Sequence, residues 1–141
     1  MVEQGLRTMS GSLDIVLLLM DPKQDHRAVI RDAWNSDNEE FFIGLDMAIN
    51  PSLEFGLAKV PGLPDDDFEP GTLSFSAFYN LAMTLANQHP TNGADLVEEA
   101  ALTANAQEWN LWYRRILLKS LHKHLPMEVI QSELIRLTTE Q

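Results

Sequence analysis

The chain contains no cysteine and no long apolar run. Without cysteine it has no disulfide, no thiolate nucleophile and no cysteine ligand for zinc, so a reducing compartment is the expected environment. The longest apolar run, residues 15–20, is far shorter than the roughly 20 residues of a membrane-spanning helix. It follows an aspartate and lacks a basic leader or a small-residue cleavage site. We therefore expect an intracellular, cytoplasmic protein that does not enter a membrane.

Cations are scarce and unevenly placed. The 141 residues suffice for one domain with a core, and their net charge of −11 argues, as a sum, against binding nucleic acid. Residues 1–109 hold 18 carboxylates and 5 cations, whereas residues 110–141 hold 5 cations and 3 carboxylates. Any surface that binds a polyanion is therefore expected near the C-terminus.

Helical periodicity dominates the pattern of apolar residues. It predicts helices over residues 13–20 and 25–34, a third from a cap at Ser36 or Asp37 to Ile49, a fourth opened by Ser74 or Ser76 and running to Ala86, and further helices over residues 94–103, 108–125 and 127–137, with prolines at several breaks. Residues 50–72 contain four prolines and three glycines and are predicted to form one long loop. No strand pattern or repeat is found. We predict an all-α fold, a single compact bundle of about six or seven helices over residues 12–138, after a flexible segment 1–11.

The segment 108–125 gathers aromatic and cationic side chains. As one helix, it would place Trp109 and Tyr113 on a buried arc, and Arg115, Lys119, His122 and Lys123 on the opposite arc. An ordinary surface helix does the same. The cations, however, form a row that is almost free of carboxylates. Such a row can follow a phosphate backbone.

The turn Thr91-Asn92-Gly93 precedes a predicted helix. Free N–H groups and the positive end of the helix dipole make such a turn a candidate phosphate site. A simple N-cap by Thr91 or Asn92 explains the residues equally well, and Asp95 in the first turn would compete with a bound anion.

No catalytic or metal-binding set can be assembled. The chain has no Gly-rich phosphate loop and no nucleophile elbow. His122 and His124 are two residues apart, which is the wrong spacing for one face of a helix. The acidic run at residues 65–69 lacks the glycine and distal glutamate of a calcium loop. We expect no catalytic residue and no bound metal or cofactor in this chain.

The order of segments resembles the N-terminal helical DNA-binding domain of phage-type, T-even-like ATP-dependent DNA ligases, over roughly residues 12–137. The matching segments are "SLDIVLLLMDPKQDHRAVIRDAW", "FFIGLDMAINPSLEFGLAKVP", "LSFSAFYNLAMTLANQHPTNGADLVEEAA" and "EWNLWYRRILLKSLHKHLPMEVIQSEL". The local signatures are the Asn-Pro-x-x-x-Phe-Gly loop, the turn before a helix, and the Arg-Arg-x-x-x-Lys helix.

The resemblance implies an accessory domain that grips nicked double-stranded DNA through its backbone and minor groove, independently of sequence, in replication or repair. It implies DNA contacts at Thr91, Asn92 and Gly93 on the turn, and at Arg114, Arg115 and Lys119 on the basic helix; the cationic row adds Lys123. A ligase adenylation core, fused or separate, would use ATP and Mg²⁺ to seal the nick. No lysine of this chain begins the Lys-x-Asp-Gly motif of such a core, so we expect no nick sealing by the chain alone.

A protein-interaction module is the alternative hypothesis. The acidic N-terminal helices and the "DDDFE" stretch would dock a basic partner, such as a replication protein, or mimic DNA.

Overall fold

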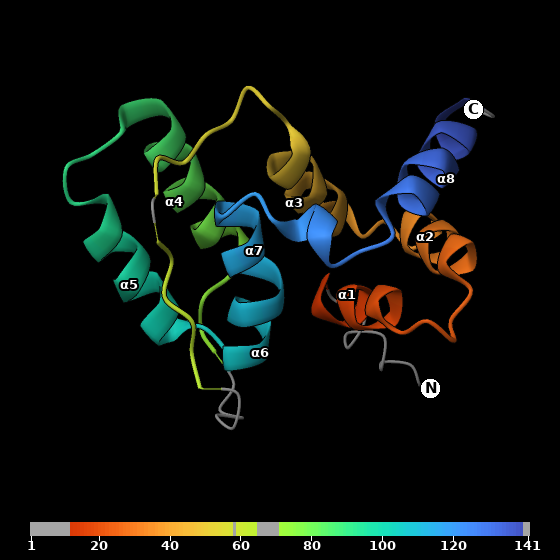
Figure 1. Cartoon of the computed structure of the whole chain (residues 1–141), viewed down its shortest axis with the longest axis horizontal. Helices are drawn as coiled ribbons and strands as arrows, with labels where there is room; N and C mark the ends of the chain where they lie inside the picture. Colours follow the sequence, from red (N-terminus) through yellow and green to blue (C-terminus); the bar gives the residue numbers. More distant parts are fainter. Residues whose placement is uncertain (1–11, 58, 65–70, 140–141) are drawn as a thin grey trace. The chain divides into compact units, whose positions relative to one another are not determined.

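A computed structural model describes residues 12–57, 59–64 and 71–139. Their regular structure is entirely helical, which confirms the predicted all-α class (Figure 1). The described chain divides into two units: a central unit, Leu45–Leu121, and a terminal unit formed by the residues up to Gly44 together with those from His122 onward. The predicted flexible segment 1–11 lies outside the described residues. In the described part, no helix is long and apolar enough to cross a membrane.

The terminal unit contains α1 (Ser12–Met20), α2 (His26–Asn35), the first half of α3 (Glu39–Ile49) and α8 (Met127–Thr139). The turn predicted at Asp21-Pro22 separates α1 from α2, and the Gln24 N–H donates to the Asp21 carbonyl at 3.2 Å. Asp25 caps α2 by accepting a hydrogen bond from the Ala28 N–H at 3.2 Å.

A buried carboxylate joins α2 to α8, which lie side by side (Figure 1). Glu133 is 1% exposed. It forms ion pairs with Arg136, one turn along α8, and with Arg27 Nη1 of α2 at 3.4 Å. The hydrogen bond from Arg136, with further help from Arg27 and Arg31, outweighs burial and holds the pKa of Glu133 below its usual range.

The central unit contains α4 (Phe75–Gln88), α5 (Gly93–Thr103), α6 (Ala106–Glu108), a π-helical turn (Trp109–Tyr113) and α7 (Arg114–Leu117). Ser74 caps α4 by accepting from the Ala77 N–H at 3.1 Å. The aromatic residues of the predicted arc, Trp109 and Tyr113, are at most 3% exposed, and Trp112, which the prediction did not place on that arc, is buried as well. The described residues of the predicted 50–72 loop form neither helix nor strand.

The predicted continuous helix 108–125 is wrong beyond Leu117. The Lys119 N–H donates to the Ile116 carbonyl and the Ser120 N–H to the Arg115 carbonyl, both at 3.0 Å, and Lys119 has a left-handed φ of 57°. This is the Schellman pattern that ends helices, with lysine where glycine is usual. A short 3₁₀ helix, Leu121–Lys123, follows. Periodicity could not reveal the break because the apolar spacing continues through it.

Candidate nucleic-acid interface

Side chains of the π-helical turn form hydrogen bonds with the backbone of the long loop. Trp109 Nε1 donates to the Pro61 carbonyl at 2.7 Å. Asn110 pairs with the backbone of Leu63 in both directions: its Oδ1 accepts from the Leu63 N–H and its Nδ2 donates to the Leu63 carbonyl, each at 2.8 Å. Because π-helical turns are rare and place side chains at unusual angles, this turn gives the loop a defined path beside α7.

A first hollow of about 530 Å³ lies where the loop passes α5 and α7. Lys59 and Arg114 line it, with the carboxylate-bearing Glu98 of α5. Arg114 Nε donates to the Val60 carbonyl at 2.9 Å, so the loop fixes the direction of the guanidinium. Lys59 is exposed. The hollow thus presents two cations with one acidic neighbour.

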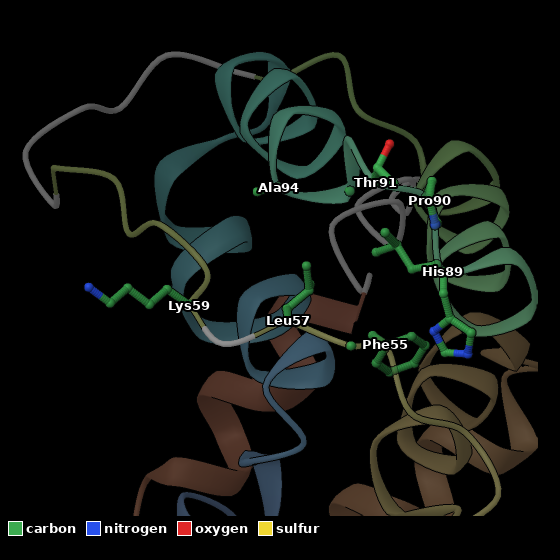
Figure 2. Close-up of a pocket in the computed structure, with 10 residues that line it drawn as sticks. Phe55, Leu57, Lys59, His89, Pro90, Thr91 and Ala94 are labelled. Carbon is green, nitrogen blue, oxygen red and sulfur yellow. The ribbon is translucent and has the colours of Figure 1, made fainter.

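A second hollow, of about 380 Å³, adjoins the first and shares Lys59 and Ala94 with it. Its lining includes Thr91 and Gly93 at the start of α5 and His89 at the end of α4. In Figure 2 the Lys59 side chain extends away from the neighbouring helices and the Thr91 hydroxyl points outward. The two hollows therefore bring the predicted turn and Arg114 onto one continuous surface, with Lys59 between them.

The Thr91-Asn92-Gly93 turn begins α5 as predicted. Thr91 and Asn92 are exposed, and Gly93 is buried. Asn92 occupies the N-cap position but makes no side-chain capping hydrogen bond. A Cβ at Gly93 would lie 3.1 Å from Leu85 Cδ2, so the close packing of α5 on α4 favours glycine there. From the sequence, a side-chain N-cap at Thr91 or Asn92 is one explanation of this turn, and Asn92 does not form such a cap.

Arg115 is half-buried beside Arg114. Burial and, next, the positive charge of Arg114 lower the pKa of Arg115. Two adjacent guanidinium groups repel one another, and an anion bound near them would relieve that repulsion.

The sequence predicts that Lys119 lies on an outward-facing row of cations, but in the structure its ammonium contacts backbone carbonyls. Its ammonium donates to three carbonyls of the central unit: those of Met47 at 3.0 Å, Leu53 at 2.7 Å, and Asn50. Three acceptors take up all three N–H donors of the charged form. Burial lowers the pKa of Lys119. The contacts join the end of α3 and the start of the loop to the end of α7.

Lys123 and His122 belong to the terminal unit, where both are exposed in the 3₁₀ helix. Arg115 and Lys119 belong to the central unit. The row of four cations therefore does not lie on one helix.

Sequence reasoning did not select Lys59. One signal was present: Lys59 is the single cation between Arg31 and Arg114. The acidic residues 65–69 lie outside the described part of the chain. Among the described residues no group of three or more histidine, aspartate or glutamate side chains could hold a metal ion.

Two solved structures have folds similar to this chain. The structure named Pmar-Lig_PreS3 has a TM-score of 0.78 at 24% identity, over 91% of this chain and 30% of that chain. The structure named Pmar-Lig_Pre has a TM-score of 0.76 at 26% identity, over 89% of this chain and 29% of that chain. This chain spans less than a third of the length of either. No protein-family model and no curated protein matches it. Both names contain "Lig", and the similarity of this chain to the two structures is one of fold.

Proposed function

We propose that this chain is the DNA-binding part of an ATP-dependent DNA ligase, which grips nicked duplex DNA while an adenylation core, fused or separate, seals the nick with ATP and Mg²⁺. The observation that carries the proposal is the continuous surface formed by the α5 turn, Lys59 and Arg114 on a fold shared with the two "Lig" structures.

The proposed contacts are to phosphates and are independent of base sequence. The first turn of α5 would offer backbone N–H groups and the positive end of a helix dipole to one phosphate, with the exposed Thr91 and Asn92 beside it. Lys59 would contact a neighbouring phosphate. Arg114 and Arg115 would complete the cationic side of the surface. Lys123, exposed in the terminal unit, stays a predicted contact.

Lys119 takes a different part in this proposal. Because its three donors are used by backbone carbonyls, we assign it the role of holding the loop that carries Phe55 and Lys59. Phe55 reinforces the arrangement, since the ammonium lies 5.7 Å from its ring centroid.

Carboxylates limit how tightly the surface can bind. Glu98 lines the hollow beside Arg114, and Asp95 and Glu99 are exposed on α5. We therefore expect weak, strongly salt-dependent binding by the chain alone, with the ligase core supplying further contacts in the complete assembly.

The test compares two exposed lysines. The full chain carrying Lys59→Glu or Lys23→Glu is titrated against fluorescent nicked duplex at several salt concentrations, and anisotropy is recorded. Both variants change the net charge equally, but Lys23 lies in the α1–α2 turn of the terminal unit. We expect Lys59→Glu to weaken binding about tenfold and to reduce the slope of log affinity against log salt by about 0.9, the value for one lost phosphate contact.

Equal effects of the two substitutions would mean that net charge alone governs binding, and the assigned surface would be rejected. Absence of binding to nicked duplex at low salt, in both the wild type and the variants, would remove the DNA-binding proposal itself.

A further inference from the structure

Helix α1 of the terminal unit carries large apolar residues on both its buried and its outer side, with Asp14 as its charged residue. Seven of its nine residues are large and apolar. Ile15, Val16 and Leu19 are buried, whereas Leu17, Leu18 and Met20 remain 39–40% exposed. A surface helix of a globular protein normally carries polar residues on its outer face, and an apolar helix is normally covered. The composition of α1 therefore makes its outer face a candidate for contact with another apolar surface.

A groove of about 350 Å³ runs between α1 and α2. Its volume is at the lower end of the roughly 300–1,000 Å³ typical of binding pockets. The charged residues of its lining are two aspartates, Asp25 and Asp32, and no cation lines it. The apolar part of the lining consists of Ile15, Leu18, Ala28, Val29 and Ala33.

Helix α2 separates its charges onto two faces. At 100° per residue, Asp25 and Asp32 lie on the groove face, and Arg27 and Arg31 lie on the opposite face. Arg27 is paired with Glu133 of α8, and Arg31 helps to lower the pKa of that same carboxyl. The arginines of this helix are therefore directed toward α8, and the groove is left negative.

The walls of the groove are held in place by the turn between the two helices. His26 Nε2 lies 2.9 Å from the Asp21 carbonyl oxygen, and the Lys23 N–H donates to Asp21 Oδ1 at 2.9 Å. The Lys23 side chain is exposed and does not line the groove. A ligand would thus meet a preformed apolar floor with carboxylates on its rim.

From this combination we infer that the α1–α2 groove docks an amphipathic segment of a partner protein that presents apolar side chains together with lysine or arginine. Apolar residues of the segment would cover Leu18 and Val29, and its cations would pair with Asp32 and with the oxygen of Asp25 that does not cap α2. The negative rim repels nucleic acid and anionic lipid headgroups, so this docking surface is distinct from the proposed DNA surface of the central unit.

The test uses a short, fluorescein-labelled helical peptide of leucine and lysine as the probe, and a leucine–glutamate peptide of equal length as its counterpart. Each is titrated into the full chain, wild type or carrying Asp32→Lys, Leu18→Ser or Glu99→Lys. Glu99→Lys is the control, because it makes the same charge change on α5 of the central unit. We expect Asp32→Lys and Leu18→Ser to weaken binding of the lysine peptide about tenfold or more. Glu99→Lys should leave binding within about twofold, and the glutamate peptide should not bind.

NMR of the bound complex should show the largest amide shifts around Leu18 and Val29. Equal weakening by Asp32→Lys and Glu99→Lys would mean that net charge alone governs binding of the peptide, and the inference would be overturned. Amide shifts confined to other helices, or no binding of the lysine peptide at all, would overturn it as well. A concentration-dependent dimer in sedimentation that Leu18→Ser abolishes would identify a second copy of the chain as the occupant, which also overturns it.

Discussion

Replacing Lys119 tests whether its ammonium, and not only its backbone, ends α7. The residue has a left-handed φ of 57°, which costs an ordinary side chain roughly 1–2 kcal/mol. Its ammonium in return satisfies the carbonyls of Met47, Asn50 and Leu53. The two effects have opposite signs, so glycine and alanine at this position separate them.

The magnitude follows from the contacts. A hydrogen bond to a charged group contributes about 1.5–3 kcal/mol net. Three such bonds would together contribute more than this. Lys119 is only half-buried, however, so water can form hydrogen bonds with some of the carbonyls once the ammonium is removed. We therefore expect Lys119→Ala to lower the free energy of unfolding by about 3 kcal/mol. Lys119→Gly loses the same bonds but relieves the left-handed backbone, so it should lose only about 2 kcal/mol.

Urea denaturation followed by tryptophan fluorescence provides the measurement. Trp34 is first replaced by phenylalanine, so that the emission reports Trp109 and Trp112 of the central unit. The expected order of stability is wild type, then glycine, then alanine, with one common m-value. An alanine variant as stable as the wild type would show that the ammonium contributes nothing, because alanine keeps the left-handed backbone and loses only the hydrogen bonds, and the reasoning would be refuted.

Two further predictions concern side chains that hold each unit together. Asn110→Ala removes both hydrogen bonds to the backbone of Leu63, so the free energy of unfolding should fall by about 2 kcal/mol and the Leu63 amide should exchange faster with solvent; unchanged exchange would contradict the assigned clamp. The hydrogen bond from Arg136 depresses the pKa of Glu133, so its stabilising contribution is present above the unfolded glutamate pKa and lost as pH falls through the folded pKa. Glu133→Gln should therefore destabilise the protein near neutral pH and flatten the acid limb of a stability–pH profile measured by chemical denaturation, and a steeper limb would contradict this.

The helical class and most breaks could be predicted from sequence because they follow from local chemistry. Asp21-Pro22 ends a helix since proline cannot continue the hydrogen-bond ladder. Asp25 and Ser74 accept N–H groups three residues along the chain, which is a local capping interaction of Asp and Ser side chains.

The end of α7 could not be predicted in this way. There the Lys119 ammonium pairs with carbonyls 66 to 72 residues earlier in the chain, and no local pattern contains these contacts. The same limit applies to Lys59. Its sequence neighbourhood is that of a loop residue, and only the clamp formed by Trp109 and Asn110 brings it between α5 and α7.

The positions of the cations explain how a chain with a net negative charge could still carry the proposed polyanion-binding surface. The arginines around Glu133 stabilise one buried carboxylate, and Lys119 stabilises a helix end, so these cations are directed at the protein itself. Lys59 and Arg114 are then the cations of the central unit that line the proposed surface, and Arg115 follows Arg114 in the chain. Because each phosphate contact contributes separately to salt-dependent binding, so small a number can orient a duplex but cannot hold it tightly. If the proposed surface binds DNA, a DNA-binding element joined to this chain would raise the affinity through effective concentration, without any added charge on this chain.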